Sequence, residues 1–144
     1  MTDKPEPVAP ADRGRDLDDP TREALGKLSE ALEVIEDARG HLYAFHRLTG
    51  AGDLTLGEAV DAFRKAGHEA LADRLERELL GRNVLEGRWT YQIVEEYDDG
   101  YYALFRGLER TALNELADGE RHVFEARMKE DRRTHGARHH ESHP

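Results

Sequence analysis

The sequence has 144 residues, of which 38% are hydrophobic and 36% charged, with a formal net charge of −10; this composition suits one small domain of amphipathic helices around a thin core. Such a charge repels the phosphate backbone of nucleic acids and anionic lipid, so we expect neither as a partner. The chain has no cysteine, which excludes disulfides and thiolate catalysis. It also has no apolar run approaching the ~20 residues of a membrane span, so we expect a cytoplasmic protein.

The two ends of the chain differ from the middle. Residues 1–19 contain several prolines and almost no large apolar side chains, so they cannot bury enough surface to offset the entropy of ordering. Residues 131–144 carry four histidines among Arg, Gly and Ser, a composition that binds transition metals weakly. We predict a disordered N-terminal tail over 1–19, a single helical domain over 20–130, and a disordered His-rich tail over 131–144.

The first predicted helix starts at Asp19 and Pro20, an N-cap followed by proline at the first helical position. From there, apolar residues at three- and four-residue spacing form one seam, interrupted only by Arg39. The glycines within residues 49–53 predict that this helix ends at Leu48 and that the chain reverses. The seam consists of Leu25, Leu28, Leu32, Ile35, Leu42 and Phe45.

A second helical region is predicted after this reversal. Thr55 and Glu58 have the spacing of a capping box, in which the side chain of each residue binds the backbone amide of the other. The apolar spacing that follows predicts two short helices joined at Gly67. Residues 82–87 are expected to form a connector.

The segment 89–105 has two interpretations. Apolar residues alternate after Trp89, and Asp99-Gly100 is a strong two-residue turn, which favours a β-hairpin. The segment also has apolar residues at helical spacing, and a lone hairpin is marginal without a sheet. We therefore favour one long helix with a kink near Gly100, followed by a helical segment over 120–129. The predicted fold is an all-α bundle of about four to five helices; the alternative is an α+β fold with a small hairpin at 89–105.

The densest carboxylate cluster offers a candidate metal site. Glu95 and either Asp98 or Asp99 would share one helix face, as ligands of a hard divalent cation must. Asp118 and His122 are four residues apart, a spacing that lets a carboxylate and an imidazole meet on one helix face and bind metal or exchange protons. His122 and Glu125 are the candidate ligands that would join the carboxylates near Tyr97. The alternative for the acidic cluster is a solvated face.

Two sets of apolar residues are candidate interaction surfaces. One segment holds most of the aromatic residues, and such residues serve core packing or, where they keep a polar end in water, a partner groove. In a thin bundle the first helix would leave part of its seam exposed, available to a second copy or another protein. The candidate interaction residues are Leu25, Leu28, Leu32, Trp89, Tyr97 and Tyr101.

The sequence contains no complete phosphate-loop, dinucleotide-binding, zinc-protease or serine-hydrolase motif, which argues against an enzyme. We therefore expect a cytoplasmic helical interaction or regulatory module without a cofactor, whose partner is another protein or a second copy of the chain. The alternative is a divalent-metal-binding bundle, with a hydrolase activity that uses the carboxylates of 95–99. A third option is a small-molecule sensor with a pocket lined by Trp89, Tyr97 and Tyr101.

Overall fold

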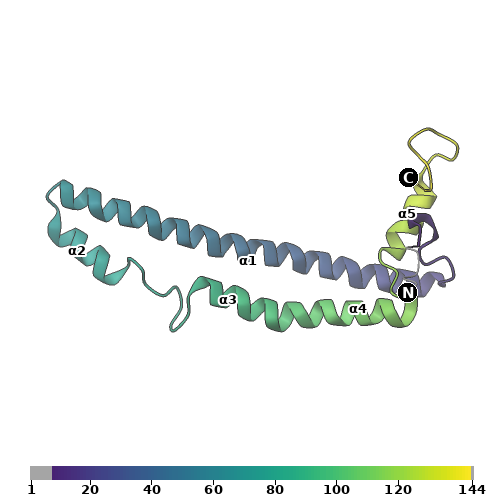
Figure 1. Cartoon of the computed structure of the whole chain (residues 1–144), viewed down its shortest axis with the longest axis horizontal. Coiled ribbons are helices and arrows are strands. Elements are labelled where there is room, and N and C mark those ends of the chain that lie inside the picture. The colour runs from purple at the N-terminus through teal and green to yellow at the C-terminus, as the bar shows by residue number, and fades with distance from the viewer. Residues whose placement is uncertain (1–7, 144) are drawn as a thin grey trace, which may run out of the picture. The chain divides into compact units, whose positions relative to one another are not determined.

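The computed structural model describes residues 8–143, and within this range the protein is all-α (Figure 1). The predicted all-α fold is confirmed, and the hairpin alternative is not needed, because the described residues form no strand beyond an isolated bridge between Leu85 and Arg88. No helix of the described chain is long and apolar enough to span a bilayer. The elements are the 3-10 helix η1 (Pro10–Asp12), α1 (Asp19–Lys65), α2 (Glu69–Glu78), α3 (Thr90–Tyr97), the π-helix η2 (Asp98–Tyr102), α4 (Ala103–Ala117) and α5 (Val123–Arg132).

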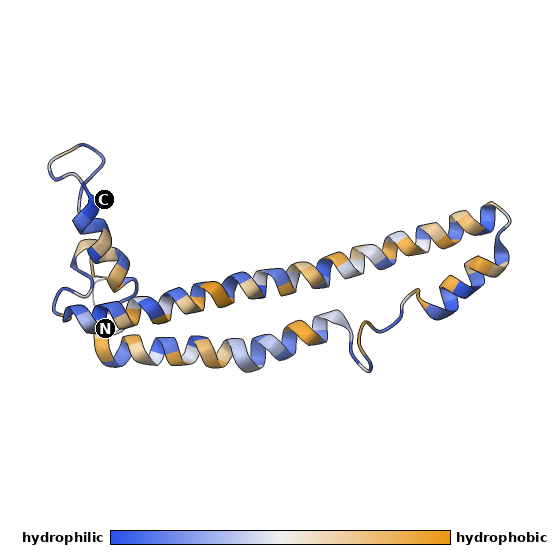
Figure 2. Cartoon of the chain, turned by 180° about the vertical axis from the view of Figure 1, so that it is seen from behind, coloured by the Kyte–Doolittle hydropathy of each residue, from blue (hydrophilic) through white to orange (hydrophobic). Residues whose placement is uncertain are grey.

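The chain forms two compact units. The terminal unit comprises the described parts of Met1–Ile35 and Ala103–Pro144, and the central unit comprises Glu36–Tyr102. The helix α1 contributes its first part to the terminal unit and the rest to the central unit. Hydrophobic and hydrophilic residues alternate along α1 and along α4 (Figure 2), as expected for helices that are only partly covered. The predicted single domain over 20–130 stays a prediction.

The helix α1 begins close to the predicted position. The carboxylate of Asp18 accepts a hydrogen bond of 2.7 Å from the amide of Thr21, so the N-cap interaction comes from the residue before Asp19. The hydrogen bond from Thr21 lowers the pKa of Asp18. The Asp19-Pro20 pair therefore predicted the start of α1 to within one residue.

The predicted end of this helix at residues 49–53 is wrong, because α1 continues through them to Lys65. The capping box is wrong too: Thr55 lies inside the helix, and its hydroxyl donates to the carbonyl of Ala51 at 3.1 Å. Each helical glycine costs about 1 kcal/mol relative to alanine. Contacts at both ends of the segment offset that cost. His46 Nδ1 lies 2.8 Å from Thr90 Oγ1, and the carboxylate of Asp53 accepts a hydrogen bond of 2.8 Å from the amide of Gly81.

The predicted junction at Gly67 is confirmed, but the helix before it is the long helix α1 and not a separate short helix. Gly67 has a φ of +87° between the end of α1 and the start of α2, a left-handed conformation that glycine adopts without steric cost. Arg64 then holds α2 on the end of α1 through Glu69 at 2.9 Å and Asp73 at 2.6 Å, and through Glu76. Figure 1 shows α2 turning back at this end of α1.

The helical interpretation of the aromatic segment is confirmed, including its irregularity. The helix α3 starts after Trp89, whose amide donates to Gln92 Oε1 at 2.8 Å. A π-helix over Asp98–Tyr102 stands where we expected a kink near Gly100; it fits one extra residue into a helical turn. The last helix starts three residues later than predicted, because His122 has a φ of +59° and α5 begins at Val123.

The terminal unit has a small core. Leu25, Leu113, Ala117 and Val123 are buried together. A side chain at Gly26 would collide with Phe124, since a Cβ there would lie 2.6 Å from Phe124 Cβ. The absence of a side chain at Gly26 therefore lets α5 approach α1 closely.

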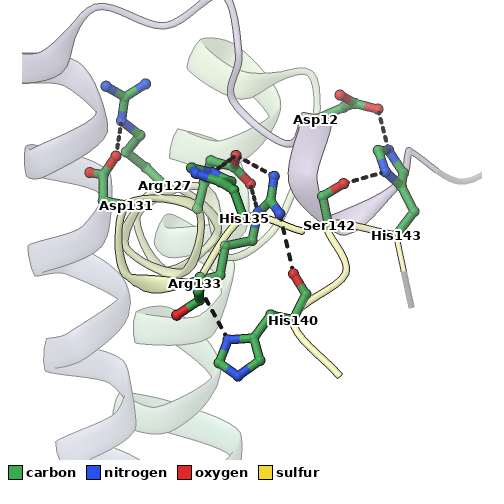
Figure 3. A network of polar contacts seen from close by, with 10 residues as sticks. Asp12, Arg127, Asp131, Arg133, His135, His140, Ser142 and His143 are labelled. Atoms are coloured by element: carbon green, nitrogen blue, oxygen red, sulfur yellow. Dashed lines mark hydrogen bonds and ion pairs between the residues drawn. The ribbon is translucent and has the colours of Figure 1, made fainter. Parts of the chain in front are cut away.

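The described parts of the predicted tails make specific contacts in this unit. The guanidinium of Arg22 is buried and donates to the carbonyls of Gly14 and Leu17, at 2.7 and 2.9 Å. At the other end, Arg133 donates to Glu130 at 2.6 and 2.8 Å. It also donates to the carbonyl of His140 at 3.2 Å (Figure 3). Arg133, and secondarily His135, lower the pKa of Glu130 to about 2. Residues 1–7 of the predicted N-terminal tail lie outside the described residues.

Candidate functional site: a groove beside Trp89

The central unit contains a groove of about 680 Å³. One wall is the part of α1 that includes Leu56, and the other walls are the end of α2 with Leu79 and the connector with Val84 and Trp89. These side chains are apolar and large. The groove is therefore suited to an apolar occupant rather than to a hydrated ion.

Glycines make room for this groove. Gly50 and Gly52 line it from α1, and a Cβ at either position would have no atom within 4 Å. Gly81, with a φ of +70°, allows the turn after α2, and its amide is held by Asp53 at 2.8 Å. The residues that suggested a helix end in the sequence thus shape a concave surface instead.

Trp89 is the large aromatic side chain at the groove. It is 55% exposed, while Leu79 and Val84 are 50% and 42% exposed. Its ring makes an edge contact with Tyr91, the two ring centres being 5.4 Å apart, which limits the orientations that the indole can take. The sequence predicted Trp89 as an interaction residue, but it missed Leu56 and Leu79, whose only signal was their helical spacing. It also missed Val84, which lies in the predicted connector over 82–87.

The other predicted aromatic residues form a cluster at the far end of the central unit. Tyr97 stacks on Tyr102 with ring centres 6.4 Å apart and packs on Tyr101 at 5.9 Å. Arg39 lies over the ring of Tyr102 at 5.1 Å, and the Tyr102 hydroxyl donates to Glu36 at 2.6 Å. Tyr97 is half-buried by this packing, whereas Tyr101 is 55% exposed. Neither tyrosine lines the groove beside Trp89.

Among the carboxylates of 95–99 predicted as metal ligands, Asp98 is paired with an arginine. Both oxygens of Asp98 accept from Arg39, at 2.7 and 2.9 Å, and the guanidinium of Arg39 lowers the pKa of Asp98. Glu96 pairs with Arg88. Glu95 and Asp99 are exposed. Arginines therefore pair with Asp98 and Glu96 of the acidic cluster, and Asp98 could bind a metal only by releasing Arg39.

The two remaining predicted ligands lie in the terminal unit and meet a residue that the sequence did not single out. His122 and Glu125 come together with Glu33 of α1. The distance from His122 Nδ1 to Glu125 Oε1 is 3.9 Å. No spacing rule could have found Glu33, because its partners lie about ninety residues away along the chain.

The leucines predicted as an interaction surface are less exposed than expected. Leu25 is only 3% exposed and belongs to the core of the terminal unit, because Leu113, Ala117 and Val123 cover it. Leu28 and Leu32 are half-buried. As an interaction residue, Leu25 is therefore a wrong prediction.

Comparison with known protein families, with characterised proteins and with solved structures finds no match to this chain.

Proposed function

We propose that the protein is a non-catalytic interaction module, whose groove beside Trp89 receives a positively charged amphipathic helix of a protein partner. The observation that carries the proposal is the imbalance between buried and exposed apolar residues in the central unit. Throughout Glu36–Tyr102, the buried apolar residues are Val60, Ala72 and Val94, while residues as large as Leu54 and Trp89 are 76% and 55% exposed.

A partner that covers these exposed apolar residues would gain a large hydrophobic contribution to its binding free energy. Removing one large apolar side chain from water is worth about 1.5–3 kcal/mol. Leu79, Val84 and Trp89 all line the groove, and each is exposed by two fifths or more. An amphipathic helix, with apolar residues at three- and four-residue spacing, fits such a concave apolar surface.

The charge of the central unit favours a basic partner over a second copy. Residues 36–102 contain 14 acidic and 8 basic residues, a net charge of −6. Two copies would repel each other, whereas a cationic helix would be attracted and bind faster. Arg82 is the basic residue at the groove, and its guanidinium donates to the carbonyl of Glu78 at 3.5 Å.

The proposal can be tested with the intrinsic fluorescence of Trp89, because it is the only tryptophan. The probes are two peptides of about 18 residues, long enough to form a helix. Both carry leucine at three- and four-residue spacing; one has lysine at the remaining positions and the other glutamate. We expect the lysine peptide to shift Trp89 emission to shorter wavelength in a saturable and salt-sensitive way, and the glutamate peptide to cause no shift.

Two glycine substitutions in α1 give a matched control. Gly52→Leu fills the groove, whereas Gly40→Leu adds the same side chain elsewhere on α1, where a Cβ also has no atom within 4 Å. Only Gly52→Leu should abolish the shift. Equal binding by both variants, or no response to the lysine peptide, would contradict the proposal. Sedimentation could instead show a dimer whose formation shifts Trp89 emission without any peptide. In that case the occupant of the groove would be a second copy of this chain and not a basic partner.

A further inference from the structure

The terminal unit brings three potential metal ligands together. Glu33 lies on α1, His122 precedes α5, and Glu125 lies in the first turn of α5. One ligand atom from each residue can be chosen such that all three atoms lie within 4.8 Å of one another. This cluster is separate from the groove beside Trp89, which belongs to the central unit.

The charges of the cluster are not balanced. Two carboxylates face one imidazole, and among residues 8–143 neither Glu33 nor Glu125 forms an ion pair with lysine or arginine. Two other carboxylates of the chain do have such partners: Asp98 binds Arg39 and Glu130 binds Arg133. Since like charges at this distance repel, a cation bound between them would stabilise the arrangement.

The chemistry of the three side chains selects a class of cation. A neutral imidazole nitrogen and carboxylate oxygens are the ligands that Zn²⁺ and similar divalent transition metals take in proteins, whereas Mg²⁺ and Ca²⁺ prefer oxygen alone. His122 and Glu125 have side chains that are 55% and 38% exposed, so water can complete the coordination. We infer that Glu33, His122 and Glu125 bind a divalent transition metal ion, for which Zn²⁺ is the best match.

Such an ion would fasten the start of α5 to α1. Val123, between the proposed ligands, is buried in the core, and Phe124 packs on Gly26. Because the three ligands come together only in the folded unit, metal binding would add to its stability. The inference goes beyond the proposed interaction function and does not depend on it.

The test uses the full-length chain and Co²⁺, whose visible absorption reports coordination, followed by Zn²⁺ in calorimetry. The histidines of the C-terminal segment would bind metal themselves, so the background variant carries glutamine at His135, His139, His140 and His143. On this background we expect one equivalent of Co²⁺ to bind, Zn²⁺ to displace it, and Zn²⁺ to raise the melting temperature.

Three single substitutions on this background assign the ligands. Glu33→Gln and His122→Gln should each weaken Co²⁺ binding at least about tenfold, the loss that even outer-shell changes cause, and should abolish the thermal shift. His41→Gln, an exposed histidine of α1, should change neither. Loss of all binding in the background variant, or unchanged binding in Glu33→Gln, would overturn the inference. Trp89 fluorescence reports the groove separately, so the two proposals can fail independently.

Discussion

At the scale of single residues, the structure explains why a charged residue interrupts the apolar seam of α1. Arg39 takes a seam position, and there it binds both carboxylate oxygens of Asp98 and lies over the ring of Tyr102. A bidentate pair of this kind fixes orientation more strongly than a single contact. Arg39 therefore joins α1 to the π-helix.

Asp98→Asn should lower the free energy of unfolding at pH 7, because it removes the charged partner of Arg39. Arg39 lowers the pKa of Asp98 in the folded protein, so the stabilisation is fully present above the unfolded pKa of about 3.9. It is lost as the pH falls through the lowered folded value. Urea unfolding at pH values from 7 to 2 should show the gap between the two proteins closing only below about pH 4.

A neighbouring substitution serves as the control for this pH dependence. Asp99→Asn removes the same charge from an exposed position beside Asp98. Its effect on unfolding should be smaller than that of Asp98→Asn, because no arginine of the described chain pairs with Asp99. If both variants behave alike, the Arg39–Asp98 pair contributes nothing specific to stability.

At the scale of elements, the main surprise is the length of α1. The glycines at residues 49–53 have the composition of a helix end, yet no side-chain cap or left-handed glycine occurs there. Contacts from Thr90 and Gly81 hold the segment in the helix from outside. Helix propensity is a weak preference that tertiary contacts override.

A pair of alanine substitutions distinguishes the two descriptions of α1. Asp18→Ala should destabilise the protein, because the Asp18 carboxylate caps Thr21. Thr55→Ala should be neutral or stabilise by a few tenths of a kcal/mol, because alanine is the better helix former inside a helix. Chemical denaturation of both variants measures this. A loss of about 1 kcal/mol in Thr55→Ala would instead indicate a capping box and a helix that ends before Thr55.

At the scale of the whole molecule, the two units differ in how they use their apolar residues. The terminal unit buries Leu25, Leu113, Ala117 and Val123 as one cluster. The central unit depends more on polar contacts, such as those of Arg64 with α2 and Arg39 with Asp98. Regions with few buried apolar residues open locally at low free energy.

Hydrogen exchange should therefore be uneven along the chain. We expect the amides of α2 to exchange at least about tenfold faster than those of α4, which corresponds to about 1.4 kcal/mol in opening free energy. The lysine peptide should slow exchange in α2 and residues 82–90 and leave α4 unchanged, whereas the glutamate peptide should change neither. Mass spectrometry of proteolytic fragments resolves these segments. Equal protection of α2 and α4 would contradict the difference between the units.

The sequence by itself determined the all-α class, the start of α1 near Pro20, the junction at Gly67 and the irregular turn near Gly100. These features depend on apolar spacing and on glycine conformation within a few residues, so local pattern is sufficient. It also identified Trp89, His122 and Glu125 as candidates, because aromatic and metal-ligating residue types are visible without a structure.

The tertiary structure alone decided how these residues are used. Residues 49–53 remain in α1, and Asp98 pairs with Arg39. Leu56, Leu79 and Val84 line the groove with Trp89. Glu33 lies close to His122 and Glu125. Each of these outcomes depends on contacts between residues far apart in the chain. Sequence spacing carries no information about such contacts, because it reports only which residues share a face of one helix.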